Sequence, residues 1–332
     1  MAPLRPRGEL SAGRGATEGP LRWTGRSAAC GPDQPGTARK SRPGLLCRTM
    51  AFFCAVFFAA TGAALPPPVH AAPPGAARGG PEDTGIAVNT LGMEFVLVPA
   101  GVFVMGDLEG EDDEAPLREV TLTRDFRLGR HEVTQRQFEL VTGRNPSVFP
   151  GPDNPVDSVS WEDAREFVSL LNAREGTRKY RLPTEAEWEH AARGGTRSRF
   201  FFGDDTSLLG RYDWVRSNSG GVTHPVGTKD PGPYGLFDMH GNVGEWVEDR
   251  YGYHHYAEAR RVEDPTGPAS GTERVVRGGS RHDDPFHARP ADRLGSDPAE
   301  VPEEIRGSYG FRVAYFPEPV KKSLFGRGKG RR

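Results

Sequence analysis

The sequence predicts a single α+β domain with little regular secondary structure. Glycine and proline supply 43 and 30 of the 332 residues, a composition that favours turns over long elements. Short alternating apolar stretches, typical of strands, flank three segments that begin with helix-capping residues. Because no internal repeat divides the chain, we expect one domain over residues 86–316.

Strands are predicted at the start of this domain, within residues 86–105. Apolar residues alternate there, and Pro99-Ala100-Gly101 predicts a hairpin turn between two strands. Residues 119–124 alternate again and predict a further strand. Between these strands, residues 107–114 (DLEGEDDE) form an acidic run that we expect to be a solvated loop. A second cation site is the alternative there.

Three helices are predicted from capping boxes, in which Ser or Thr precedes an acidic or amide side chain by three positions. The predicted segments run from Thr134 to Gly143, from Ser160 to Gly176 and from Thr184 to Gly194. The second segment has the clearest amphipathic spacing. Trp161 and Trp188 lie on these helices, and we expect both to anchor the core.

Beyond Phe200 we expect mostly irregular structure, with strands only at 273–277 and 310–316. His254-His255 and the neighbouring tyrosines are expected to form a solvated aromatic loop. His131-Glu132 lacks the second histidine of a zinc-protease helix, so we interpret this pair as structural.

The N-terminal part has the features of an export signal. Residues 50–65 form an apolar run of sixteen, shorter than the roughly 20 residues that span a bilayer. Basic residues precede it and small residues follow, so we expect a signal peptide cleaved near Ala71 and a periplasmic or secreted protein. An uncleaved anchor is the alternative, and we expect no other membrane contact. Residues 1–71 are thus an extension and signal, with Met50 as the expected start.

The remaining flanking segments are a linker and a tail. Residues 72–85 form a Pro/Gly/Ala-rich linker, and residues 317–332 carry six Lys or Arg and one Glu. We expect this basic tail to be disordered. The body at 80–316 has 27 Lys and Arg against 41 Asp and Glu, a net charge of −14. An acidic body argues against nucleic acid as a partner.

The stretch Tyr234–Trp246 (YGLFDMHGNVGEW) combines three glycines with two carboxylates, Asp238 and Glu245. Glycine permits the positive φ of an irregular loop, whose carbonyl oxygens can turn inward beside the carboxylates. Hard cations such as Ca²⁺ prefer this mixture of oxygens. The alternative is a buried turn with a solvated Asp238 and a capping Glu245.

Several stretches together resemble one family, in the same order and spacing from Gly92 to Ala314. The most specific are RLPTEAEWE at 181–189 and GLFDMHGNVGEW at 235–246. The others are GMEFVLVPAGVFVMG, HEVTQRQF, NPVDSVSWEDAREFVSLLN, VVRGGS and GFRVA. The chain resembles the sulfatase-modifying-factor domain of formylglycine-generating enzymes. This resemblance implies a compact domain similar to a C-type lectin fold, poor in regular structure and stabilised by Ca²⁺.

The resemblance also implies the ligands of a calcium site. They would be the Asp238 side chain, the Gly241 and Val243 carbonyls and the Glu245 side chain. Family members often have Asn at the position of Asp238, and an added charge should keep or strengthen binding. A second family site begins at a loop that matches Asn218-Ser219. That loop is shortened here and lacks the acidic ligand, so we do not expect the second site.

The copper centre of the family, by contrast, has lost its ligands. In the oxidising enzymes two cysteines follow the GGS motif, five positions apart, and bind Cu(I). The matching positions after Ser280 hold Asp283 and Ala288, and every cysteine of the chain precedes residue 60. Because soft Cu(I) requires thiolates, we expect no copper cofactor and no catalytic residues for formylglycine formation by the family route.

Three functions remain to be compared. In the first, an exported Ca²⁺-stabilised domain without oxidase chemistry binds a peptide, glycan or partner protein. Its groove would be lined by Ser280, His282, Asp283, His287 and Arg289. In the second, His282, Asp283 and His287 serve as metal-binding or acid–base groups of an enzyme with altered chemistry. In the third, the protein activates sulfatases despite its missing thiols.

Overall fold

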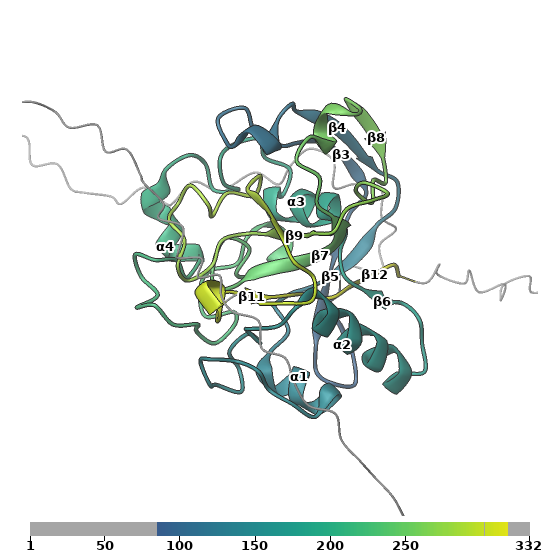
Figure 1. Ribbon diagram of the computed structural model, residues 1–332, viewed down its shortest axis with the longest axis vertical. Coiled ribbons are helices and arrows are strands. Elements are labelled where there is room, and N and C mark those ends of the chain that lie inside the picture. Colours follow the sequence, from purple (N-terminus) through teal and green to yellow (C-terminus); the bar gives the residue numbers. More distant parts are fainter. Residues whose placement is uncertain (1–84, 302, 318–332) are drawn as a thin grey trace, which may run out of the picture. The chain divides into compact units, whose positions relative to one another are not determined.

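The computed structural model describes residues 85–301 and 303–317, all within the unit Pro68–Arg332 (Figure 1). The predicted extension and signal at 1–71, the linker up to residue 84 and the tail from residue 318 lie outside the described residues. Within the described ranges, no helix is long and apolar enough to cross a membrane.

Short strands dominate the described part of the chain. They are β1 (Ala87–Val88), β2 (Glu94–Val98), β3 (Gly101–Met105), β4 (Arg118–Leu122), β5 (Phe126–Gly129), β6 (Tyr180–Arg181), β7 (Gly244–Arg250), β8 (Arg261–Glu263), β9 (Arg274–Arg277), β10 (Arg293–Ser296), β11 (Tyr309–Gly310) and β12 (Ala314–Tyr315). They form three sheets with the orders β1-β2-β5-β12-β6, β10-β9-β7-β11 and β3-β4-β8.

The helices are α1 (Gln135–Thr142), α2 (Trp161–Arg174), α3 (Glu185–Arg193) and α4 (Leu209–Tyr212). Short 3₁₀ turns are η1 (Asp112–Glu114), η2 (Thr206–Leu208), η3 (Pro233–Gly235), η4 (His255–Ala257) and η5 (Glu303–Ile305). The combination of separate sheets and helices confirms the predicted α+β class (Figure 1).

The three capping boxes form as predicted. The hydroxyls of Thr134, Ser160 and Thr184 each accept a hydrogen bond from the amide three positions later. Helices α1 and α3 end at the left-handed residues Gly143 and Gly194, as expected. These boundaries follow from contacts within a few residues, which explains why the local sequence sufficed to predict them.

The predicted hairpin at Pro99-Ala100-Gly101 is wrong. Strand β2 pairs with β1 and β5, whereas β3 pairs with β4 in another sheet. The Ala100 amide donates to Asp125 Oδ1 at 2.8 Å instead of to a partner strand. The segment therefore carries the chain from one sheet to the next, because each strand finds its partner later in the sequence.

The glycine-rich stretch Tyr234–Trp246 leads directly into β7, the longest strand and one that was not predicted. β7 lies between β9 and β11, and α3 packs against β7 and β9 (Figure 1). The fully buried side chain of Trp188 on α3 confirms the expected anchor. Trp161 is only partly buried, and its indole N–H donates to the Val247 carbonyl at 2.8 Å.

The predicted strand at 310–316 is divided. β11 belongs to the four-stranded sheet and β12 to the five-stranded sheet, so residues 311–313 pass from one sheet to the other. The fully buried Arg312 lies within this passage. The predicted strand at 273–277 is confirmed as β9.

Two loops expected to be solvated are partly buried. Asp113 and Glu114 of the acidic run are 2% and 0% exposed, and Tyr256 of the aromatic loop is fully buried. The guanidinium groups of Arg118 and Arg293 lie 4.1 and 4.5 Å from the centre of the Tyr256 ring. Both loops are therefore held against the protein by buried arginine side chains that are distant in the sequence. Local composition does not predict such contacts.

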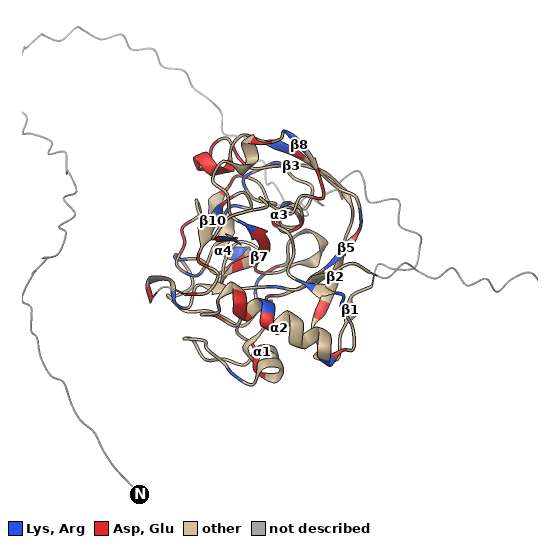
Figure 2. Ribbon diagram, turned by 45° about the vertical axis from the view of Figure 1, so that its right-hand side comes forward, with Lys and Arg blue, Asp and Glu red and all other residues tan. Residues whose placement is uncertain are grey.

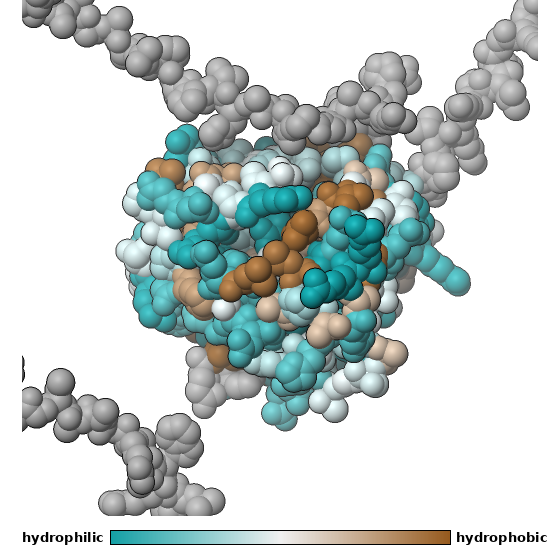
Figure 3. All heavy atoms as spheres, turned by 90° about the horizontal axis from the view of Figure 1, so that it is seen from above, coloured by the Kyte–Doolittle hydropathy of each residue, from teal (hydrophilic) through white to brown (hydrophobic). Residues whose placement is uncertain are grey.

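The surface is mixed in character. In the view of Figure 2, acidic and basic residues lie close together along the ribbon. Figure 3, seen from above Figure 1, shows an apolar strip between hydrophilic side chains. On the edge strand β3, Val102 is 62% exposed.

Candidate functional site

The stretch Tyr234–Trp246 contains three left-handed residues that are not glycine: Tyr234 with φ 61°, Asp238 with φ 56° and Asn242 with φ 69°. The Asn242 side chain holds the loop in place. Its Nδ2 donates to Glu132 Oε2 at 3.0 Å and to the His224 carbonyl at 3.1 Å. Its Oδ1 accepts from the His224 amide at 3.0 Å. This buried amide thus stabilises a conformation that costs free energy for residues other than glycine.

Asp238 is buried and incompletely hydrogen-bonded. Its Oδ2 accepts from the Gly227 amide at 2.8 Å. Its Oδ1 is buried and has no hydrogen-bond donor among the described residues. Burial raises the pKa of Asp238 to about 6. Since an unpaired carboxylate oxygen in the interior is costly, this atom favours a proton, a water or a cation beside it.

Two further carboxyl groups lie near Asp238. Glu132 Oε1 accepts from the Val243 amide at 3.2 Å, and Asp213 Oδ1 accepts from the His240 amide at 2.9 Å. Burial, followed by the charge of Asp238, raises the pKa of both groups well above the usual range. The loop therefore encloses an excess of acidic groups.

Glu245 differs from these three, because both of its oxygens are fully engaged. Arg312 donates to Oε1 from Nη2 at 2.6 Å and to Oε2 from Nε at 2.7 Å. The Trp188 indole N–H adds a hydrogen bond to Oε2 at 2.9 Å. Arg312 also donates to the carbonyls of Gly129 and Phe237, both at 3.0 Å. The pair therefore connects four separate segments.

The four implied calcium ligands differ in availability. Asp238 Oδ1 lacks a donor, and the carbonyls of Gly241 and Val243 accept no hydrogen bond from the rest of the described chain. Glu245 has no oxygen to spare while Arg312 is in place. Three of the four positions therefore keep an oxygen that no donor of the described chain occupies.

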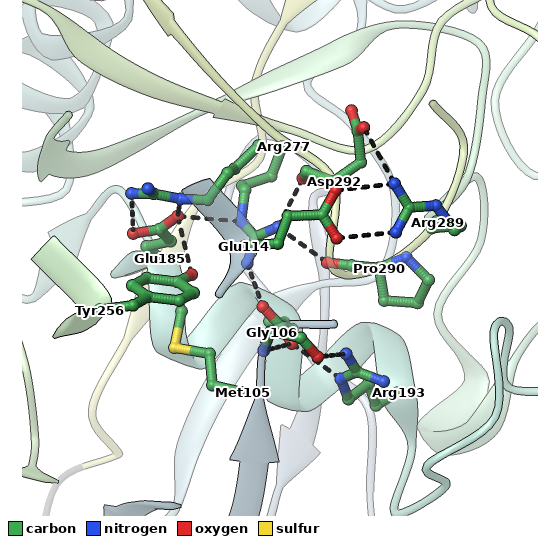
Figure 4. A network of polar contacts seen from close by, with 12 residues as sticks. Met105, Gly106, Glu114, Glu185, Arg193, Tyr256, Arg277, Arg289, Pro290 and Asp292 are labelled. Carbon is green, nitrogen blue, oxygen red and sulfur yellow. Dashed lines mark hydrogen bonds and ion pairs between the residues drawn. The ribbon is translucent and has the colours of Figure 1, made fainter. Parts of the chain in front are cut away.

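The predicted groove residues do not line one common surface. Arg289 is 1% exposed and forms a bidentate ion pair with Glu114, with both N–O distances at 2.7 Å (Figure 4). Asp107 accepts from the same guanidinium at 3.1 Å. The expectation that Arg289 faces a ligand is therefore wrong, because the acidic loop covers it and uses its donors.

The three side chains of the altered-chemistry hypothesis turn to different partners. Asp283 Oδ2 accepts from the Ser280 amide at 2.8 Å and from its hydroxyl at 2.7 Å. His287 Nδ1 lies 3.2 Å from Asp292 Oδ1, and the His282 ring contacts the Arg281 guanidinium. Among the residues that the structure describes, no group of three or more His, Asp or Glu side chains is arranged to hold a metal.

Ala288, which the resemblance matched to the second family cysteine, is fully buried. Its carbonyl accepts a hydrogen bond from His240 Nδ1 at 3.0 Å. A Cβ added at Gly279 would lie 3.0 Å from the Ala288 Cα, so glycine is needed for this close approach. Burial lowers the pKa of His240 to about 3, which keeps its ring neutral.

The sequence analysis missed a network of buried ion pairs on α3 (Figure 4). Glu185 accepts from Arg293 Nε at 2.7 Å, and Glu189 accepts from Arg193 Nε at 2.8 Å and pairs with Arg277. These residues are almost fully buried. A signal was present in the i,i+4 spacing of Glu185 and Glu189, which puts both on one helix face.

We predict that Arg289→Ala lowers the free energy of unfolding by about 3–5 kcal/mol, because Glu114 would remain buried without its partner. Chemical denaturation measures this change. Arg136→Ala is the control, since Arg136 pairs with Asp153 on an exposed surface and should cost at most about 1 kcal/mol. Equal losses in the two variants would contradict the structural role of Arg289.

We also predict a pH dependence that originates at Asp249. This residue is 2% exposed, and its Oδ2 accepts from the Glu185 amide at 2.9 Å. Burial, followed by the charges of Glu185 and Glu187, raises the pKa of Asp249 well above its usual value. The folded state therefore binds more protons than the unfolded state above about pH 4, and stability falls as pH rises through the folded-state pKa.

Asp249→Asn removes this titration and retains a hydrogen-bond acceptor for Glu185. The stability of this variant relative to wild type should therefore increase from about pH 4 to pH 7, by up to about 1.4 kcal/mol per unit of pKa shift. Denaturant unfolding at a series of pH values measures the difference. A difference that stays constant with pH would refute the assignment.

Comparison with known proteins gives the family. The model of the sulfatase-modifying factor enzyme 1-like domain matches residues 85–316. The serine/threonine-protein kinase pkn1 of Chlamydia pneumoniae is 34% identical over 249 residues, which cover 67% of this chain and 38% of that protein. The chain thus spans well under half of that relative. The formylglycine-generating enzyme of Streptomyces coelicolor is 30% identical over 313 residues, covering 74% of this chain and 95% of that enzyme.

Solved structures agree with this result. The Treponema denticola variable protein 1 is 29% identical, with a TM-score of 0.63 and coverage of 70% of this chain and 99% of that one. PvdO from Pseudomonas aeruginosa is 28% identical, with a TM-score of 0.62 and coverage of 70% and 98%. Because the family model covers nearly all of the described residues, the chain belongs to the sulfatase-modifying factor enzyme 1-like family.

Proposed function

We propose that this protein is an exported binding domain of the family that does not use the copper-dependent oxidation of its enzymes. One observation carries the proposal: the positions that correspond to the two cysteines hold Asp283 and Ala288. Asp283 Oδ2 is bound by Ser280, and Ala288 is buried against Gly279. Residues 85–316 contain no cysteine, so no thiolate is available for Cu(I).

The proposed binding surface for a peptide, glycan or partner protein is the exposed part of segment 280–293. His282 and Phe286 are exposed there, and the Phe286 ring lies edge-to-face with His287 at 5.2 Å. Aromatic rings and imidazoles provide apolar contact and hydrogen bonds together. The alternative of an enzyme built on His282, Asp283 and His287 is less well supported, since these groups turn to separate partners.

Buried arginines hold this surface in a fixed shape. Arg281 donates from Nε to the Gly307 carbonyl at 2.8 Å and from Nη2 to the Arg306 carbonyl at 2.9 Å. Arg289 donates from Nε to the Phe286 carbonyl at 2.7 Å. A loop that is already ordered loses less conformational entropy when it binds a partner, which favours recognition by an otherwise irregular segment.

We further propose that Ca²⁺ binds to Asp238 and to the carbonyls of Gly241 and Val243. The support is that Asp238 Oδ1 and the two carbonyls have no hydrogen-bond donor among the described residues and come from one short loop. A bound ion would supply positive charge to a region with an excess of carboxyl groups. Glu245 would join these ligands only if Arg312 released one of its oxygens. Export is proposed from the apolar run at 50–65 and the small residues near Ala71.

Calcium removal tests the metal proposal. We expect a chelator to lower the melting temperature and added Ca²⁺ to restore it, because an ion bound only to the folded state stabilises it by mass action. The effect is about 2.7 kcal/mol at a hundredfold excess over Kd. Asp238→Ala should abolish the difference because it removes the side-chain oxygen ligand, whereas Asp230→Ala, at a half-exposed surface position, should keep it. Identical melting of wild type in chelator and in calcium would disprove the calcium site alone.

Turnover tests the absence of oxidation. Full-length protein, supplied with copper and oxygen, should form no aldehyde on a cysteine-containing sulfatase peptide in mass spectrometry, and a formylglycine-generating enzyme is the positive control. Aldehyde formation would overturn the proposal. Iron, copper or zinc bound in stoichiometric amount by wild type and lost in His282→Ala would favour the altered enzyme instead.

A further inference from the structure

A cavity of about 530 Å³ lies beside Phe316, which is close to the last described residue. None of its lining residues belongs to the surface at 280–293 or to the glycine-rich loop before β7. Its size falls within the range of small-molecule sites. Its walls come from the end of β4, from α2, from the start of α3, from β7 and from residues 264–266. We propose that this cavity binds a single carboxylate attached to an apolar group, with Arg124 as the carboxylate-binding residue.

Two of the three arginines in the cavity wall already have carboxylate partners. Arg181 forms a bidentate pair with Glu187, with N–O distances of 2.6 and 2.7 Å. Arg165 Nη1 donates to Glu248 Oε1. These four groups therefore neutralise one another in pairs and leave no net charge in their part of the wall.

The third acidic group, Asp264, is also engaged. Its Oδ1 accepts from the Thr123 amide at 2.9 Å, and its Oδ2 accepts from the Thr123 hydroxyl. These contacts hold Asp264 against the chain segment that precedes Arg124. Its charge lowers the local positive potential, so the cavity suits a singly charged anion better than a doubly charged phosphate.

Arg124 is the exception among the charged groups of the cavity. Within the described ranges it forms no ion pair and no side-chain hydrogen bond, and its guanidinium lies 3.8 Å from the centre of the Phe316 ring. Arg181 contacts the same ring, at 4.3 Å. A guanidinium stacked by its face keeps its N–H donors at its edge, where they match the two oxygens of a carboxylate. Contact with the Phe316 ring restricts where the Arg124 guanidinium can lie, and no described acceptor uses its N–H groups.

The other walls of the cavity are suited to an apolar group. Leu122, Pro265 and Phe316 line it with hydrocarbon and aromatic surface, and only Leu122 among them is fully packed into the core. An apolar group that enters would displace water from this surface, at about 25 cal/mol per Å² buried. A carboxylate at Arg124 and an apolar body against Phe316 would thus satisfy both features of the site.

Binding to the full-length protein tests the proposal, with N-acetylphenylalanine as the probe and its uncharged carboxamide as the matched control ligand. Calorimetry or ligand-observed NMR should show the acid binding at least about tenfold more tightly than the amide, as expected for one charge-assisted bidentate contact. 3-Phenylpropanoate and acetyl-Ala-Ala-Phe distinguish a free organic acid from a peptide C-terminus, and tight binding of either supports the proposal.

Variants locate the contact. Arg124→Gln should remove the preference for acid over amide, and Arg124→Lys should keep part of it, since the charge remains without the planar fork. Arg136→Gln, an exposed arginine on α1 away from the cavity, should bind as wild type does. Because Arg124 is exposed, melting curves should show each variant folded. Three outcomes would overturn the proposal. They are equal binding of acid and amide, an acid preference that survives Arg124→Gln, and the lack of saturable binding at ~10 mM, the weak end of specific affinities.

Discussion

The buried ion pair between Glu245 and Arg312 is the contact on which the rest of the described structure depends. It joins β7 to the passage between β11 and β12, to α3 through Trp188, and to β5 through the Gly129 carbonyl. Both side chains are at most 1% exposed, so their removal from water is costly. The cost is offset because the guanidinium and both carboxylate oxygens have partners of good geometry. Glu245 of the four-stranded sheet is thereby tied to Arg312, in the passage between the four-stranded and the five-stranded sheet.

Arginine has the same role elsewhere in this domain. Arg277 donates from Nη1 to the Pro290 carbonyl at 2.9 Å, and Arg281 and Arg289 donate to carbonyls of neighbouring loops. A chain with short strands leaves many carbonyls without a partner strand, and each of these groups needs a donor when buried. A guanidinium offers five N–H donors in a fixed plane and can therefore satisfy a carboxylate and one or two carbonyls together. Buried arginines thus replace part of the hydrogen bonding that longer elements would supply.

The candidate sites differ in which of their polar groups already have hydrogen-bond partners. In the loop before β7, Asp238 retains an oxygen without a donor, which is the chemistry of a cation site. At 280–293 the arginines are fully used, and the exposed side chains are aromatic or imidazole groups suited to recognition. At the cavity beside Phe316, Arg124 has N–H donors that no acceptor of the described chain uses, which is the chemistry of an anion site. At the first and the third of these places, the group without a partner among the described residues is the one that our proposals use.

The sequence by itself determined the fold class, the capped helices and the family, because these depend on patterns within short segments. It also identified Asp238 and the glycine-rich loop as a candidate cation site, and it contains no cysteine between residues 85 and 316. Only the tertiary structure decided that β2 and β3 belong to different sheets and that Glu114 covers Arg289, 175 residues away. It alone showed that Glu245 is bound by Arg312 and that Arg124 has no ionic partner among the described residues. These outcomes depend on which buried charges meet across long separations, and local spacing carries no information about such partners.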